Sequence, residues 1–86
     1  MDLGLKGKVV LISGSYRGTG AGTAKVLATE GAIVAIHGHQ EGQASAVADE
    51  IRLGGGEAIE VHGSLLTTDG VENIVSDVEH RCGPVE

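Results

Sequence analysis

The sequence has almost no aromatic side chains: its 86 residues include no tryptophan or phenylalanine, and Tyr16 is the only tyrosine. A hydrophobic core must therefore come from valine, isoleucine, leucine and alanine, which bury less area per side chain than an aromatic ring. A chain of this length forms at most one small domain, in which roughly 60 to 70% of the unfolded surface becomes buried. We therefore expect a thin core and marginal stability.

Cysteine and long apolar runs are also scarce. Cys82 is the only cysteine, so it cannot form an internal disulfide and has no second thiol with which to share a metal ion. No apolar run approaches the roughly 18 residues that span a bilayer, and the first residues lack the apolar segment of a secretory signal. We expect a cytoplasmic protein with no membrane partner.

The basic residues are too few and too dispersed for a nucleic-acid surface. Six Lys and Arg stand against twelve Asp and Glu, which gives a formal net charge of −6. Binding of nucleic acid is therefore not expected. His37 and His39 supply only half of a closed tetrahedral site, and the other histidines have no ligand-like spacing to them, so no metal site is predicted.

Three short runs rich in β-branched residues predict strands, at residues 8–13, 32–37 and 57–62. The first two are apolar nearly throughout, as in strands that are covered on both faces. A first helix is predicted over residues 18–30, and apolar residues recur at i, i+3, i+4 and i+7 after the second and third runs. These residues are Ala44, Val47, Ala48 and Ile51 in one helix, and Val71, Ile74, Val75 and Val78 in the next. The alternating order predicts an α/β fold with a parallel sheet, the first strand beside the second and the second beside the third.

Local signals mark the ends of these helices. Gly31 and Gly54 stand where a left-handed glycine commonly ends a helix. Asp69 with Glu72 resembles a capping box at the start of the third helix. Glu41 is predicted to begin the second helix, where an acidic side chain complements the helix dipole.

The segment VVLISGSYRGTGAG, residues 9–22, places glycines between the first strand and the first helix. Unpaired N–H groups at a helix N-terminus attract anions, and glycines let a phosphate approach the backbone closely. The spacing Gly14-x-x-x-Gly18-x-Gly20 differs from the G-x-G-x-x-G fingerprint, and no Lys-Ser or Lys-Thr follows as in a P-loop. A phosphate-binding turn is favoured, and a tight turn without a ligand is the alternative.

This segment and the residues after it resemble the short-chain dehydrogenase/reductase family. The family signature is Thr or Ser, Gly, three residues, Gly, any residue, Gly; it corresponds to SGSYRGTG at residues 13–20, and the similarity continues in register to residue 86. The resemblance implies a Rossmann-like, doubly wound fold that binds a nicotinamide dinucleotide. It also implies that the adenosine ribose and the pyrophosphate are surrounded by Gly14, Tyr16, Arg17, Gly18, Thr19 and Gly20.

The choice of dinucleotide depends on the end of the second strand, where an acid would accept hydrogen bonds from a ribose 2′-hydroxyl and repel a 2′-phosphate. Residues 32–40 contain no acid. Similar reductases that use NADP(H) often carry a basic residue where His39 stands, together with an arginine at Arg17. These two residues are therefore predicted to clamp the 2′-phosphate, and NADP(H) is favoured over NAD(H), for which Glu41 is the rival acid. The alternative is a solvated loop arginine and an ordinary turn histidine.

The segment after the third strand departs from the family pattern. Relatives usually have an aspartate there that contacts the adenine amino group, and by register Ser64 occupies its position, with Leu65 beside the ring. An uncharged hydroxyl predicts a weaker contact.

The residues that the family uses for hydride transfer have no counterpart here. No Tyr-x-x-x-Lys occurs, because position 20 is glycine, so no catalytic residue is assigned and the chain is expected to be inactive alone. Relatives begin their fourth strand near the final GPVE, so residues 1–86 are expected to be a truncated dinucleotide-binding domain. The implied function is the NAD(P)-binding portion of an oxidoreductase acting on an alcohol or carbonyl, and the alternative is a non-catalytic nucleotide-binding or protein-interaction module.

The missing fourth strand has a structural consequence. It would pair with the first strand in a doubly wound sheet, so residues 8–13 are expected to form an open edge. We expect the chain to associate with itself through that edge.

Overall fold

The computed structural model describes residue 4 and residues 6–83, and it contains three parallel strands that are each followed by a helix. The elements are β1 (Val9–Ile12), α1 (Gly18–Thr29), β2 (Ile33–Gly38), α2 (Ser45–Leu53), β3 (Glu57–His62) and α3 (Thr68–Cys82). The strand order is β1-β2-β3. The α/β class, the parallel sheet and the strand neighbours predicted from the sequence are therefore confirmed. Among the described residues, none of the three helices could serve as a membrane span.

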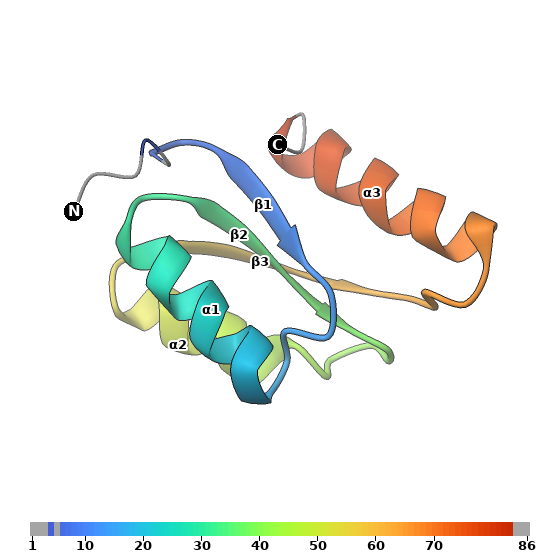
Figure 1. Cartoon of the computed structure of the whole chain (residues 1–86), viewed down its shortest axis with the longest axis horizontal. Coiled ribbons are helices and arrows are strands. Elements are labelled where there is room, and N and C mark those ends of the chain that lie inside the picture. The colour runs from blue at the N-terminus through green and yellow to red at the C-terminus, as the bar shows by residue number, and fades with distance from the viewer. Residues whose placement is uncertain (1–3, 5, 84–86) are drawn as a thin grey trace.

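The helices cover both faces of the sheet. Figure 1 shows α1 and α2 on one face and α3 on the other. Because successive side chains of a strand point to opposite faces, Val34 and Ile36 pack beneath α1 and α2, whereas Ala35 belongs to the cluster beneath α3. This arrangement explains why β2, the central strand, is apolar along most of its length and almost wholly buried.

Small residues let α1 lie close to the sheet. Its buried residues are Ala21, Ala24 and Ala28, whose methyl groups hold the helix nearer to the strands than larger side chains would. The third helix contributes Ile74 and Val78, which are 3% and 0% exposed, to the other cluster. The buried core is thus two thin layers of aliphatic residues, as the scarcity of aromatic side chains predicts, with the half-buried Tyr16 packed against one of them.

Two expectations about helix ends are wrong and one is confirmed. Gly31 follows α1 with a φ of 94°, the left-handed conformation that was predicted. Gly54 has a φ of −82°, and the left-handed residue after α2 is Gly55, with a φ of 91°. Glu41 does not begin the second helix, because α2 starts at Ser45 and has no acidic residue in its first turn.

The predicted capping box at α3 is also wrong. The helix begins at Thr68, and Thr67 is its N-cap, with a hydroxyl that accepts a hydrogen bond of 3.0 Å from the amide of Gly70. Asp69 therefore lies inside the first turn, where its charge complements the dipole but caps nothing. A threonine cap of this kind stabilises a helix by about 1 kcal/mol.

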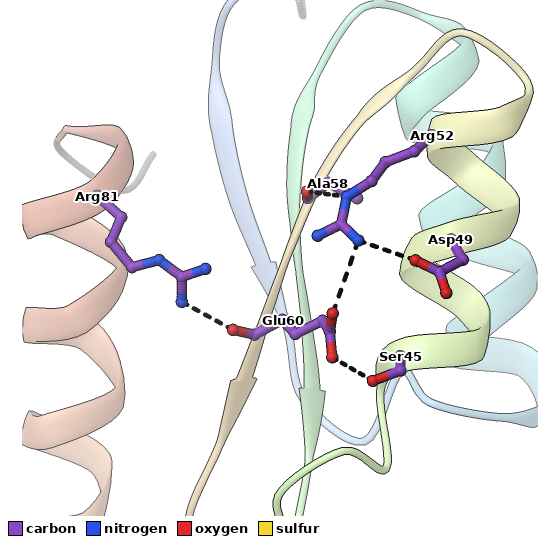
Figure 2. A network of polar contacts seen from close by, with 6 residues as sticks. All are labelled: Ser45, Asp49, Arg52, Ala58, Glu60 and Arg81. Atoms are coloured by element: carbon purple, nitrogen blue, oxygen red, sulfur yellow. Dashed lines mark hydrogen bonds and ion pairs between the residues drawn. The ribbon is translucent and has the colours of Figure 1, made fainter.

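Arginine side chains protect the outer edge of β3. Figure 2 shows Arg52 of α2 and Arg81 of α3 approaching this strand from the two sides. Arg52 Nε donates to the carbonyl of Ala58 at 3.1 Å, and Arg81 Nη1 donates to the carbonyl of Glu60 at 2.8 Å. Because β2 pairs with the other edge of β3, these two carbonyls point outward and would otherwise be open to another strand.

The guanidinium groups that make these contacts are held by acids on their own helices. Arg52 Nη1 donates to Asp49 at 3.0 Å and lies 3.6 Å from the carboxylate of Glu60, and Arg81 Nη1 donates to Asp77 at 3.2 Å. The outer edge of β3 is therefore occupied by side chains along part of its length.

The outer edge of β1 differs. In the part of the chain that the structure describes, β1 pairs only with β2. The Lys8 carbonyl accepts from the Ile33 amide at 2.8 Å, so in this parallel ladder Val10 and Ile12 also direct their backbone groups toward β2. Leu11 directs its backbone groups the other way. The sheet thus has one protected edge and one open edge.

Candidate functional site

The carboxyl ends of all three strands lie at the same end of the sheet, because the strands are parallel. The segment 13–17 follows β1, residues 39–44 follow β2, and residues 63–67 follow β3. In open α/β sheets, ligands bind outside the carboxyl ends of the strands. The residues predicted to bind the cofactor are all found in these three segments or in the first turn of α1.

Three glycines, Gly14 in the first segment and Gly18 and Gly20 in the first turn of α1, serve two different purposes. Gly14 and Gly18 have φ values of 62° and 63°, a left-handed conformation that other residues adopt only with strain. A Cβ added to either would meet no atom within 4 Å, so both glycines border open space. A Cβ on Gly20 would lie 3.1 Å from the Ser15 Cα, so this glycine is needed where α1 touches the loop.

The N-terminus of α1 lacks the groups that usually satisfy a helix end. Its N-cap is Arg17, whose side chain makes no capping hydrogen bond, and its first turn contains no acid. The amides of Gly18, Thr19 and Gly20 have no partner within the helix, because an α-helix leaves its first N–H groups unpaired. By contrast, α3 is capped by its own Thr67. The start of α1 is therefore a positive, uncapped helix end beside open space, which suits an anion.

The hydroxyl of Ser15 lies between β1 and β2 where the two strands separate. Ile12 pairs with Ile36, so the next bond of a regular parallel ladder would join the Ile12 carbonyl to the His37 amide. Instead, Ser15 Oγ donates to the Ile12 carbonyl at 2.6 Å and accepts from the His37 amide at 3.0 Å. Both backbone groups stay paired while the chain turns away from the sheet. Ser15 is fully buried and does this without contacting solvent.

The ring of His37 joins two of the three segments. It is 0% exposed; its Nδ1 accepts a hydrogen bond of 2.9 Å from the amide of Gly14, and its Nε2 lies 3.0 Å from the carbonyl of Gly63. Since Nδ1 accepts and a carbonyl cannot donate, the proton of the neutral ring is on Nε2. The amide of Gly14 is therefore engaged by a side chain, so this glycine supplies backbone shape to the loop while its N–H faces the protein.

Neither Ser15 nor His37 was identified from the sequence as a site residue. One signal was available: a histidine that ends an otherwise apolar strand is a buried polar group and needs hydrogen-bond partners. The sequence does not show that those partners are Gly14 and Gly63, because they lie 23 and 26 residues away.

Three residues predicted to contact the cofactor, Arg17, Tyr16 and His39, cluster around the Tyr16 ring. The guanidinium carbon of Arg17 lies 5.2 Å from the centroid of the Tyr16 ring, and that ring packs edge-on against His39 with centroids 6.0 Å apart. His39 in turn packs edge-on against His37 at 5.2 Å. Tyr16 is half-buried, whereas Arg17 and His39 are exposed. The fold thus brings the two predicted 2′-phosphate ligands to the same ring, although they are distant in sequence.

In the segment after β3, residues 64–67 are exposed, and Gly63 lies close to Ile74 of α3. Ser64 Oγ accepts a hydrogen bond of 3.0 Å from the amide of Leu66, so part of its accepting capacity serves its own loop. Leu65 is 39% exposed. The loop lies close to the first turn of α3, where a Cβ on Gly70 would collide with the carbonyl oxygen of Ser64. Like Ser15 and His37, Gly70 was not identified from the sequence.

Comparisons with known proteins agree with this geometry. A family model described as short chain dehydrogenase matches residues 8–86. A hydroxynaphthalene reductase from Aspergillus fumigatus is 36% identical over 85 residues, 98% of this chain and 31% of its own length. Thus the chain spans about a third of the length of that curated relative.

Solved structures show the same likeness. A metagenomic short-chain oxidoreductase in complex with NADP superimposes with a TM-score of 0.88 at 30% identity, covering 95% of this chain and 37% of that one. A 3-oxoacyl-(acyl-carrier-protein) reductase from Agrobacterium tumefaciens with NADP bound has a TM-score of 0.88 at 36% identity, covering 95% of this chain and 31% of that one. The Rossmann-like fold implied by the resemblance is confirmed.

Proposed function

Because the chain belongs to the short chain dehydrogenase family, we propose that it binds a nicotinamide dinucleotide at the carboxyl ends of its strands. We propose further that it is the cofactor-binding portion of an oxidoreductase that acts on an alcohol or carbonyl. When bound, the cofactor supplies hydride-transfer chemistry. The residues of this chain bind and orient its adenosine half.

The observation that carries this proposal is the uncapped start of α1 beside two left-handed glycines. A pyrophosphate there would accept hydrogen bonds from the first amides of the helix, chiefly those of Thr19 and Gly20. The open space beside Gly14 and Gly18 is where a side chain would otherwise obstruct the ligand. The adenine would lie toward β3, beside Ser64 and Leu65. The Ser64 hydroxyl accepts one hydrogen bond from Leu66 and could accept a second from the adenine amino group.

NADP(H) is the proposed cofactor, with NAD(H) the weaker ligand. Arg17 and His39 both contact the Tyr16 ring, so a 2′-phosphate next to that ring would meet a permanent cation and an imidazole together. Two of the structural neighbours are NADP complexes. Glu41 lies in the turn before α2, outside the Arg17, Tyr16 and His39 cluster, and is exposed. The cytoplasmic location expected from the sequence remains a prediction.

Binding of dinucleotide is tested by thermal unfolding with NADP⁺, NAD⁺ and adenosine. A ligand present at a hundred times its dissociation constant stabilises the folded state by about 2.7 kcal/mol, which for a domain of this size raises the melting temperature by roughly 10 °C or more. We expect such a rise with NADP⁺, a smaller one with NAD⁺ at the same concentration, and none with adenosine, which lacks phosphate. An unchanged melting temperature with both dinucleotides contradicts the proposal.

Residues 1–86 are proposed to be one partial dinucleotide-binding domain that ends before a fourth strand. Activity is proposed only for the domain completed by the portion that relatives carry, and it is measured as NADPH oxidation with a carbonyl substrate after that portion is supplied from a relative. A non-catalytic interaction module is the second candidate, and the open edge of β1 favours it.

Self-association through β1 is the expected behaviour of that edge. The backbone groups of Leu11 face it, so Leu11→Pro removes a donor from the open edge without removing one from the β1–β2 ladder. By light scattering after size exclusion, we expect the chain and Leu11→Ala to form dimers or larger species as the concentration rises, and Leu11→Pro to remain monomeric. Circular dichroism checks that both variants are folded. A monomeric parent chain at every concentration would rule out this use of the edge.

A further inference from the structure

We propose that His37 is a positioning residue that sets the distance between the loop after β1 and the loop after β3, and thereby the affinity for the dinucleotide. This inference rests on the proposed function, because those two loops are the ones proposed to hold the pyrophosphate and the adenine. His37 itself is 0% exposed and has no surface with which to touch a ligand.

The loops that His37 joins have little conformational preference of their own. Its ring bonds to Gly14 on one side and to Gly63 on the other, and both are glycines with positive φ, of 62° and 151°. Glycine adopts many backbone conformations at similar energy, so the local sequence does not hold either loop in a single shape. A restraint from outside the loops is therefore needed, and His37 provides one.

An imidazole ring suits this role because it is rigid. Its two nitrogens are separated by a planar ring with no rotatable bond between them, so the Gly14 amide and the Gly63 carbonyl are held a set distance apart. His37 is itself held in place at two points. Its backbone amide donates to Ser15 Oγ at 3.0 Å, and the His39 ring packs against the His37 ring with centroids 5.2 Å apart. Both polar atoms of the side chain are satisfied, so leaving either loop contact unmade would carry the cost of a buried unpaired group.

Three substitutions of His37 remove its contacts with Gly14 and Gly63 one at a time or together. The amide oxygen of asparagine can take the place of Nδ1, so His37→Asn keeps an acceptor for the Gly14 amide and loses the contact with Gly63. The longer glutamine can place its amide nitrogen near Nε2, so His37→Gln keeps a donor for Gly63 and loses the contact with Gly14. His37→Leu has a comparable volume and loses both contacts.

The test is calorimetric titration of NADP⁺ into the chain and the three variants, at a temperature where circular dichroism shows each to be folded. We expect the dissociation constant to rise about tenfold or more for His37→Leu, which corresponds to a loss of about 1.4 kcal/mol of binding. The dissociation constant of His37→Asn is expected to stay close to that of the parent chain, because the Gly14 contact shapes the phosphate loop. That of His37→Gln is expected to lie between those of His37→Asn and His37→Leu. A purely structural role would change the stability of the variants but leave the affinity of the folded protein unchanged, and that result overturns the proposal.

Hydrogen exchange of the Gly14 amide, followed by NMR without ligand, gives a second readout. We expect slow exchange in the parent chain and in His37→Asn, and fast exchange in His37→Gln and His37→Leu. If the parent chain binds neither dinucleotide, the proposed function fails, and this exchange then decides whether His37 positions the loop. Equal protection in His37→Asn and His37→Leu overturns the positioning role in either case.

Discussion

Gly70→Ala is expected to lower the free energy of unfolding by roughly 3 kcal/mol, at the upper end of the cost of overpacking. The added Cβ would collide with the carbonyl oxygen of Ser64, and it would lie 2.9 Å from Thr67 Oγ1 and 3.2 Å from the Ser64 carbonyl carbon. Two of these atoms belong to the backbone and cannot rotate away, so the loop or the first turn of α3 must move. The third is the oxygen that caps α3 through the Gly70 amide.

Gly22→Ala is the matched control for this substitution. Gly22 lies within α1, a Cβ there would meet no atom within 4 Å, and its φ is not in the left-handed region. The same chemical change is therefore expected to stabilise the chain by about 1 kcal/mol, the difference in helix propensity between glycine and alanine. Urea unfolding of the two variants measures both values. Equal stability of the two variants would show that the approach of the Ser64 loop to α3 is not a structural constraint.

Arg17→Ala is expected to weaken the binding of NADP⁺ by about 10- to 100-fold and the binding of NAD⁺ by less than about threefold. Charge-assisted hydrogen bonds to a phosphate contribute about 1.5–3 kcal/mol, and only NADP⁺ carries a 2′-phosphate for Arg17 to contact. Arg17 is exposed and is the N-cap of α1 without capping it, so the substitution should leave the free energy of unfolding nearly unchanged. Titration calorimetry measures the dissociation constants of both dinucleotides, and their ratio is compared between the parent chain and Arg17→Ala.

The control for Arg17→Ala is Lys25→Ala. It also removes one positive charge, but Lys25 lies within α1, away from the N-terminus of the helix, and forms an ion pair with Glu50. We expect no change in the preference for NADP⁺. His39→Ala should reduce that preference by a smaller factor than Arg17→Ala, because the Arg17 guanidinium carries a permanent charge and several donors in a fixed geometry that suits a phosphate. If Arg17→Ala weakened the binding of both dinucleotides equally, Arg17 would contact the pyrophosphate, which both share, and not the 2′-phosphate.

The strands and most of the helix faces could be predicted from the sequence because they depend on local periodicity. Val71, which the spacing places on the same face of α3 as Ile74 and Val78, is instead 39% exposed. The third strand was predicted as residues 57–62 and is β3 (Glu57–His62) in the structure; the first was predicted at 8–13 and is β1 (Val9–Ile12). The glycine loop was recognised for a similar reason, since its left-handed conformations at Gly14 and Gly18 require a residue type that the sequence displays directly. The N-cap of α3 was harder to predict, because Asp69 and Thr67 both carry a side-chain oxygen that can cap a helix and they are only two positions apart.

The alternation of strands and helices, the aliphatic core and the glycine-rich turn each follow from residues that are neighbours in the chain, so local sequence is enough to specify them. The folded chain was needed to show that Ser15 and His37 hold the loops in place, that arginines protect β3, and that Gly70 lies against Ser64. Most of these contacts join segments distant along the chain, and the Gly70 contact depends on how a loop folds back onto a helix. A buried polar group shows in the sequence that it needs a partner, but the packing of the sheet determines which group that partner is.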